Sequence, residues 1–333
     1  MKVVAIGGGT GLSTVLRGLK HHVNEATRPA RFHPVIRRLT AVVTVTDEGG
    51  SSGRLRRDFR ILPPGDIRNC LVALAEDEQL LTQLFQYRFS SGHGLRGHNL
   101  GNLFLTALTH LTHDFAKAVR LSSEVLATRG EIFPATLADV HLKATRSDGT
   151  VVTGEHSITK TRVPIRRLQI IPSPCRPLPE TLEAIRQADL ITVGPGSVFT
   201  SLVPNLLVRG IAREIARAHA VKVLVCNLMT QPGESRGYSA ADHLRALHVH
   251  AGRRLFDYIV LNTRPLSGAL LAKYAAERAE PVALDLDAVR RMDVKPVCAK
   301  LLIEDHVARH DSRHLARLLL SLAKPRARET LEA

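Results

Sequence analysis

The segment Val3-Val4-Ala5-Ile6-Gly7-Gly8-Gly9-Thr10-Gly11 joins a short apolar run to four glycines within five positions. The residues that follow place apolar side chains at helical spacing, at Leu12, Val15, Leu16 and Leu19. The pattern predicts a strand, a tight loop and a helix. Such a junction directs backbone N–H groups and the positive end of the helix dipole at one point, and glycines let a bulky anion approach. We therefore expect a phosphate group to bind at Gly7, Gly8, Gly9, Thr10 and Gly11.

The spacing of these glycines differs from two common phosphate-binding motifs. The dinucleotide fingerprint has glycines at positions one, three and six, and Leu12 stands at the sixth. A Walker A loop would continue with Gly-Lys-Ser/Thr, which does not follow here. The alternative is a glycine turn that only packs a helix on a strand, so the interpretation depends on the later loops.

Length and composition fit a chain with a substantial core. A chain of 333 residues is long enough for one large α/β domain or two smaller ones, and a hydrophobic fraction of 44% supports a substantial core. The amino terminus enters the first strand without the regions of a signal peptide, and no apolar run approaches about 18 residues. We therefore expect a cytoplasmic protein without membrane insertion.

The net charge of +15 raises the question of nucleic-acid binding. Aromatic residues make up only 4% of the chain and tryptophan is absent, so little is available to stack on single strands. The arginines are spread along the sequence, which is typical of a solvated basic surface. Nucleic acid is therefore not the expected partner.

The four cysteines form no CxxC motif and stand mostly in apolar runs. They are Cys70, Cys175, Cys226 and Cys298. We expect buried, reduced thiols.

A second glycine-rich loop follows the continuous β-branched run at 39–46, which is typical of a strand buried in a parallel sheet. An acid at the end of the second strand commonly accepts a hydrogen bond from a ribose hydroxyl, and Asp47 stands there. Serine and arginine suit phosphate oxygens, and Ser51, Ser52 and Arg54 come next. An ordinary polar loop would explain the glycines but not this acid and arginine together.

Further polar candidates lie between residues 62 and 102. Asp66 stands where a helix is expected to begin, so it is either the N-cap or a ligand-binding residue, and Asn69 follows on the same helix. Helices are expected at 80–89 and 103–111. The glycine-rich loop between them offers hydrogen-bonding groups at His98, Asn99 and Asn102.

The stretch 115–172 departs from the alternation of strands and helices. Alternating strands surround Ser147-Asp148-Gly149-Thr150, which is a hairpin signal, and no crossover helix joins them. We expect a helical and β-hairpin lid or side segment inserted into a parallel core.

Strands expected at 190–193, 222–226 and 258–261, with helices between them, restore the α/β alternation. The loop after the first of these offers Gly194, Gly196, Ser197, Thr200 and Ser201, and Asn227 follows the second. Ligands of doubly wound sheets bind outside the carboxyl ends of the strands, where these loops lie. We predict a single Rossmann-like nucleotide-binding domain over 1–323 with a doubly wound parallel sheet, and a disordered basic tail at 324–333.

Six motifs of this chain resemble one family, which contains the bacterial gluconeogenesis factor (YvcK type) and the 2-phospho-L-lactate transferase of deazaflavin-coenzyme synthesis (CofD type). The motifs are GGGTGLSTVLRGL at 7–19, TDEGGSSGRLR at 46–56, PPGDIRNCLVAL at 63–74, GHNLGN at 97–102, GPGSVFTSLVPNLL at 194–207 and NLMTQPGES at 227–235. The last motif and AKYAAERAEPV at 272–282 look like the gluconeogenesis-factor branch.

The resemblance implies a Rossmann-like fold that binds a UDP-sugar such as UDP-N-acetylglucosamine. It also implies a regulatory role in cell shape and in growth on gluconeogenic carbon sources, and we expect a homodimer. In that branch a tyrosine of the AKY motif and an arginine near the carboxyl end contact the nucleotide sugar, and these match Tyr274 and Arg309. Tyrosine offers a ring face and a hydroxyl, and arginine offers a bidentate fork for a diphosphate.

Whether the chain is an enzyme stays open at this stage. The transferase branch moves a phospholactyl group from a guanosine diphosphate donor with magnesium, and Asp47 and Asp66 could hold Mg²⁺. Binding alone would need most of the same groups, and no nucleophile stands beside a base. A nucleotide-sugar-binding regulatory factor is the working hypothesis and a CofD-like transferase is the alternative. The missing sixth-position glycine disfavours an NAD-dependent oxidoreductase.

Overall fold

The computed structural model describes residues 1–23, 36–76, 79–160 and 163–323. The tail predicted at 324–333 lies outside the described residues. Within those ranges, no helix has the length and apolar character needed to cross a membrane.

A seven-stranded sheet forms the centre of the molecule, and every pairing in it is parallel. The strand order is β10-β9-β8-β7-β1-β2-β3. Their bounds are β1 (Lys2–Gly7), β2 (Arg38–Val43), β3 (Glu131–Pro134), β7 (Leu190–Val193), β8 (Val221–Val225), β9 (Tyr258–Asn262) and β10 (Lys295–Ala299). The chain moves outward from β1 in one direction and from β7 in the other, which confirms the predicted doubly wound, Rossmann-like fold.

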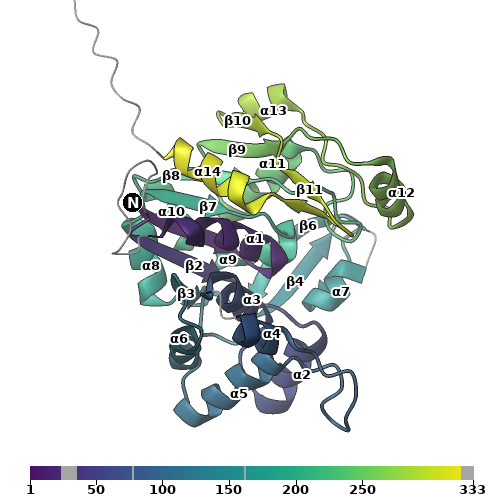
Figure 1. Ribbon diagram of the computed structural model, residues 1–333. Helices are drawn as coiled ribbons and strands as arrows, with labels where there is room; N and C mark the ends of the chain where they lie inside the picture. The colour runs from purple at the N-terminus through teal and green to yellow at the C-terminus, as the bar shows by residue number, and fades with distance from the viewer. Residues whose placement is uncertain (24–35, 77–78, 161–162, 324–333) are drawn as a thin grey trace, which may run out of the picture.

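Helices cover both faces of this sheet because right-handed crossovers that run in opposite directions place their helices on opposite faces. The helices α1 (Gly9–Leu19), α3 (Gly65–Leu74) and α14 (Ser312–Leu322) pack together, and Figure 1 shows α1 and α14 side by side in front of the sheet. A second group packs together and consists of α8 (Pro179–Arg186), α9 (Val203–Leu207), α10 (Ile211–Arg217) and α11 (Ala240–Ala251).

Helix α1 lies unusually close to α14. A Cβ atom at Gly18 would stand 1.9 Å from the carbonyl oxygen of Ser312, so only glycine allows this approach. The strand before α1 is fully buried, since Val3 and Ile6 have no exposed surface. The first strand is thus held by its neighbours in the sheet, and its helix is held by α14.

The stretch 115–172 divides into two parts. Helix α6 (Phe115–Val125) and β3 belong to the main layers, because β3 pairs with β2 at the edge of the large sheet. The rest forms a separate antiparallel sheet, called the side sheet here, with the order β5-β4-β6. Its strands are β4 (His141–Arg146), β5 (Val151–Thr153) and β6 (Ile165–Ile171), and helix α7 (Glu155–Lys160) connects β5 to β6. The hairpin predicted around 147–150 is confirmed.

Two local predictions need correction. The single helix that the sequence suggests over 205–218 is divided in two, because α9 ends at Leu207, where Val208 is extended, and α10 begins after its N-cap Gly210, whose φ is 92°. A π-helical segment η2 (Val198–Leu202) precedes α9. Cys298 is exposed, because it lies on β10 at the edge of the sheet, whereas Cys70, Cys175 and Cys226 are buried and free.

The remaining elements extend the core at its two ends. They are η1 (Lys20–His22), α2 (Gly50–Phe59), α4 (Gln79–Gln86), α5 (Leu100–Thr112), α12 (Gly268–Ala276), α13 (Leu286–Arg290), β11 (Leu302–Glu304) and β12 (Ala308–His310). Strands β11 and β12 form an antiparallel hairpin. In Figure 1 α12 projects away from the sheet, while α2, α4 and α5 lie together at the opposite end of the molecule.

Candidate functional site

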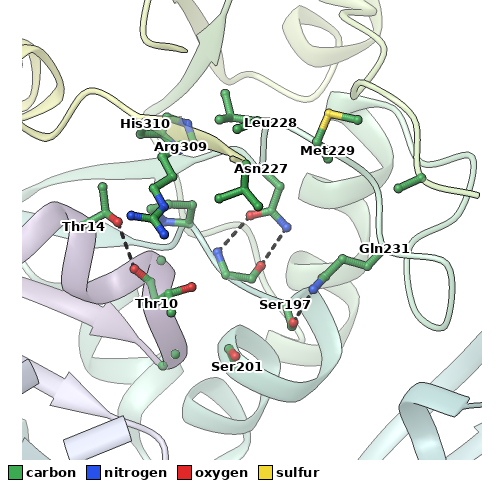
Figure 2. A pocket seen from close by; sticks show the side chains of 18 of the residues that line it. Thr10, Thr14, Ser197, Ser201, Asn227, Leu228, Met229, Gln231, Arg309 and His310 are labelled. Carbon is green, nitrogen blue, oxygen red and sulfur yellow. Dashed lines mark hydrogen bonds between the residues drawn. The ribbon is translucent and has the colours of Figure 1, made fainter. Parts of the chain in front are cut away.

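A cavity of about 780 Å³ opens at the carboxyl ends of β1, β7 and β8. This is where the strand order reverses, and its volume is in the range of small-molecule sites. Its walls come from the loops after β1, β2 and β7, the segment 227–232, α12 and the β11–β12 hairpin, with one residue from α7. Figure 2 gives a close view of its lining.

The glycine loop after β1 forms one wall of the cavity. Gly8 is the N-cap of α1 and carries no side-chain cap, so the first N–H groups of that helix have no side-chain acceptor from the cap position. Gly9 has a φ of 62°, which favours glycine. A Cβ atom at Gly11 would stand 2.2 Å from the carbonyl oxygen of Pro195. The loops after β1 and β7 can therefore touch only because position 11 has no side chain.

Acidic side chains gather at one end of the cavity. Asp66 lies against the glycine loop and accepts a hydrogen bond from the backbone N–H of Gly9. Burial, together with the charge of Asp47, raises the pKa of Asp66 to about 7. The N-cap of α3 is Pro64, so Asp66 is not the capping residue. The carboxyl group points toward the cavity loop instead, beside Asp47.

A third carboxyl group reaches this end from the side sheet. Glu155, the first residue of α7, accepts a hydrogen bond from the backbone N–H of Glu48 at 2.9 Å. Burial and the charge of Asp47 raise its pKa to about 8. Both Glu155 and Asp66 thus bind protons close to neutral pH, at the acidic end of the cavity.

The opposite end of the cavity is basic. Thr10, Thr14 and Arg17 follow one another along the cavity face of α1, and the Thr14 hydroxyl donates to the Thr10 carbonyl at 3.0 Å. Arg309 comes from β12, and Figure 2 shows it extended toward Thr10 and Thr14. Its neighbour His310 is buried, as strand alternation requires, and this burial lowers the pKa of His310 to about 4.

The loop after β7 is held by side chains of the segment 227–235. Asn227 exchanges two hydrogen bonds with the backbone of Gly196, at 2.9 and 2.8 Å, and Gln231 donates to the Ser197 hydroxyl at 2.6 Å (Figure 2). These contacts keep Gly196, Ser197 and Ser201 in the cavity wall.

A buried acid already occupies the start of η2. Glu234 accepts hydrogen bonds from the backbone N–H groups of Phe199 and Thr200 at 3.0 and 3.2 Å, and from the Thr200 hydroxyl at 2.9 Å. Burial raises the pKa of this carboxyl group. The loop after β7 could offer these backbone N–H groups to an anion, but both donate to Glu234. The Thr200 hydroxyl also donates to Glu234.

Helix α12 and the β11–β12 hairpin close the basic end together. The Tyr274 hydroxyl accepts a hydrogen bond from the Ala308 backbone N–H at 3.0 Å, and the Lys273 amine donates to the His306 carbonyl at 2.7 Å. The Ser267 backbone N–H donates to Glu304 at 2.7 Å. Tyr274 thus holds the strand that carries Arg309.

We expect Tyr274→Phe to weaken this attachment, because it removes the only hydroxyl that accepts from the Ala308 N–H in the described residues. A hydrogen bond of this kind contributes about 1 kcal/mol, so amide exchange at Ala308 should become about fivefold faster. Hydrogen exchange followed by NMR measures it. Tyr258→Phe, on β9, should leave that amide unchanged, and equal rates in wild type and Tyr274→Phe would contradict the expectation.

The predicted site residues separate into two groups. One group lines the cavity and consists of Gly8, Gly9, Thr10, Gly11, Asp47, Asp66, Gly196, Ser197, Ser201, Asn227, Tyr274 and Arg309. Gly7 and Gly194 lie at the strand ends behind it, and Asn69 accepts a hydrogen bond from Arg68. Thr200 contacts Glu234, and the remaining predicted residues form the second group.

That second group joins the start of α2 to the start of α5. The Ser51 hydroxyl hydrogen-bonds with His98 Nδ1 at 3.1 Å, and Asn102 approaches Ser52 at 3.5 Å. Asn99 caps α5, and burial lowers the pKa of His98. Arg54 donates to the Arg96 carbonyl at 2.8 Å, outside the cavity. Residues of the loop before α5 and at its start thus hydrogen-bond with the start of α2.

Several residues of the cavity and its frame were not among the predicted ones, and they include Arg17, Glu155, Gln231 and Glu234. The helical spacing of Thr10, Thr14 and Arg17 was a usable signal for the first. No local sequence pattern connects Glu155 with the loop after β1, because Glu155 lies on α7, beside the side sheet.

Comparison with known proteins places this architecture among described relatives. Residues 3–302 match the family described as 2-phospho-L-lactate transferase CofD. The gluconeogenesis factor of Bacillus subtilis is 46% identical over 324 residues, which cover 97% of this chain and 98% of the relative. A putative gluconeogenesis factor of a Nostoc species is 50% identical over 322 residues, which cover 96% of this chain and 68% of the relative.

A solved structure is also similar. The crystal structure of a Bacillus halodurans protein superposes with a TM-score of 0.90 at 47% identity, covering 96% of this chain and 99% of that one. The fold of this chain is thus shared by a solved relative.

Proposed function

This chain belongs to the CofD family and stands among the gluconeogenesis factors within it, and from this we propose that its cavity binds a nucleoside diphosphate sugar. UDP-N-acetylglucosamine is the expected ligand. The proposed role is that of a bacterial gluconeogenesis factor, a regulatory protein for cell shape and for growth on gluconeogenic carbon sources.

The observation that carries the proposal is the charge pattern of the cavity. The amino-terminal end of α1, where Gly8 provides no side-chain cap and only the Gly9 N–H is taken up by Asp66, favours a phosphate group, and so do the guanidinium groups of Arg17 and Arg309. Asn227, Ser197 and Ser201 offer polar groups along the loop after β7. A volume of about 780 Å³ accommodates a ligand larger than a single phosphate.

The acidic end fits a magnesium ion that is shared with the ligand. Mg²⁺ is usually held by one or two carboxylates plus substrate phosphates, and Asp47 and Asp66 both line the cavity. Asp66 lies against the phosphate loop, where its charge would repel a diphosphate unless a cation or a proton intervened. In the described ranges, no group of three or more His, Cys, Asp or Glu side chains could hold a metal by itself. The ligand would complete the coordination.

Group transfer is the second candidate function, and the same acidic pair favours it. A bound Mg²⁺ would neutralise charge on the phosphates of a nucleotide donor. Asp47 and Asp66 would orient that ion, and the amide groups of the loop after β1 would steady the phosphate oxygens. The two candidate functions differ in whether the bound nucleotide is released unchanged or after it has transferred a group.

Calorimetric titration with UDP-N-acetylglucosamine, GDP and NADH, each with and without Mg²⁺, tests the proposal. We expect the UDP-sugar to bind most tightly and Mg²⁺ to strengthen the binding. Tighter binding of NADH would contradict the proposed function. Tighter binding of GDP would favour the transferase, and ³¹P NMR of the incubated nucleotide would then detect turnover.

A further inference from the structure

Two arginine side chains from opposite ends of the chain face the same part of the cavity. Arg17 stands on the third turn of α1, in line with Thr10 and Thr14, and Arg309 extends toward that helix from β12. From this arrangement we infer that Arg17 is a phosphate-binding residue, and that Arg17 and Arg309 clamp one phosphate group of the ligand. The inference rests on the proposed function and names the residue that completes its anion site.

The packing of α1 on α14 brings the two arginines together. Gly18 follows Arg17 in the sequence, and Ser312 comes three residues after Arg309. The close contact between Gly18 and the Ser312 carbonyl therefore fixes both backbones beside each other. A Cβ atom at Gly18 would also stand 2.9 Å from the Cβ atom of Ala316, so this distance cannot be kept with a larger residue. The proximity of the arginines is a built feature of the fold.

Among the residues that the structure describes, no acidic side chain forms an ion pair with either of these two arginines. Burial lowers the pKa of Arg17, and the charge of Arg309 lowers it further. Of the acids that line the cavity, namely Asp47, Asp66, Glu155 and Glu277, none lies within ion-pair distance of either arginine. Like charges held together without a counter-ion cost free energy, which a bound anion would recover.

The chemistry of arginine selects the kind of anion. A guanidinium group presents a planar fork of N–H donors that matches two oxygens of a phosphate, and two forks can hold one phosphate from two sides. The carboxylates at the other end of the cavity would repel the same group. We therefore assign the phosphate to the basic end, between α1 and β12.

Variants of both arginines test this clamp in the full chain. The set is Arg17→Gln, Arg309→Gln, the double variant and Arg17→Lys, with Arg313→Gln as a matched control, since Arg313 is an exposed arginine of α14 outside the cavity. We expect Arg17→Gln to weaken binding of UDP-N-acetylglucosamine about tenfold to hundredfold in calorimetry. Arg17→Lys should lie between wild type and Arg17→Gln, because it keeps the charge but not the fork. The loss in the double variant should be smaller than the product of the single losses.

Two measurements separate a binding role from a structural one. Without ligand, Arg17→Gln should melt at the same temperature as wild type or higher, because the repulsion is relieved. Inorganic pyrophosphate should raise the melting temperature of wild type and of Arg313→Gln but not that of Arg17→Gln. A lower melting temperature of ligand-free Arg17→Gln, with unchanged affinity, would overturn the inference.

The outcomes also distinguish this inference from the proposed function. If pyrophosphate stabilises wild type through Arg17 but no UDP-sugar binds, the clamp stands and the nucleotide-sugar proposal fails. If the UDP-sugar binds equally to wild type and Arg17→Gln, the clamp fails and the proposal stands. If wild type responds to neither compound, both fail.

Discussion

Alanine at position 11 is expected to destroy the ligand site and to destabilise the fold. The new Cβ atom would stand 2.2 Å from the carbonyl oxygen of Pro195 and 2.7 Å from its carbonyl carbon, and both are backbone atoms that cannot rotate away. The loops after β1 and β7 must therefore separate. Overpacking of this kind costs about 1–3 kcal/mol, of which alanine's better helix propensity returns about 1 kcal/mol. Binding of UDP-N-acetylglucosamine should fall below detection, because both loops form the cavity wall.

Two further glycine variants are compared with Gly11→Ala. Gly18→Ala meets the Ser312 carbonyl at 1.9 Å, so it should lower the free energy of unfolding and, by displacing α14, separate Arg17 from Arg309, while leaving the loop after β1 in place. Gly268→Ala, at the start of α12, meets nothing within 4 Å and should be neutral or slightly stabilising. Urea unfolding and calorimetry measure the two effects. Normal affinity in Gly11→Ala would mean that the contact between the loops does not shape the site.

Asp66→Asn is expected to remove the pH dependence of stability that this residue imposes. The pKa of Asp66 is about 7 in the folded chain against its ordinary value of 3.8, so between these pH values the folded chain keeps a proton that the unfolded chain has lost. Stability contributed by this group is therefore present at low pH and is lost as pH rises from about 4 to 7, by at most about 1.4 kcal/mol per pH unit. The variant, which can still accept from the Gly9 N–H, should be more stable than wild type at pH 8.

The same variant should lose the effect of Mg²⁺ on ligand affinity. In wild type, Mg²⁺ and nucleotide together should bind more tightly at pH 8 than at pH 6, because the ion needs the ionised carboxylate. Asp58→Asn, an exposed change on α2 away from the cavity, should behave like wild type. Unfolding at several pH values and calorimetry with and without Mg²⁺ check this. A less stable Asp66→Asn at pH 8, or an unchanged Mg²⁺ effect, would contradict the assignment.

Local sequence patterns predicted the frame of this protein well, because they report local constraints. The glycines at 7–11 between an apolar run and a helical repeat can form little other than a strand, a loop and a helix. The hairpin around 147–150 follows from its turn residues in the same way. Strand β10 has no comparable signal, since it begins with Lys295 and Pro296 and gains its place only by pairing with β9.

The site was predicted less completely, because its polar loops look alike in sequence. Ser51 and Asn99 have the same chemistry as Ser197 and Asn227, yet the first two meet each other and the last two face the cavity or its frame. Which donors stay open to a ligand depends on tertiary neighbours such as Glu234, which takes up the N–H groups of Phe199 and Thr200. Glu155 enters the site only through the placement of the side sheet.

The packing of α1 against α14 has a consequence for the order in which the protein can form during its synthesis. Synthesis runs from the amino to the carboxyl end, so β1 and α1 are made well before α14, yet α14 packs on α1 together with α3, and β1 pairs with β7, which is made between them. Domains of this kind, with contacts between distant segments, fold slowly. The part of α1 that α14 covers therefore stays without this partner until α14 has been made, and nascent chains depend on protection from aggregation during that interval.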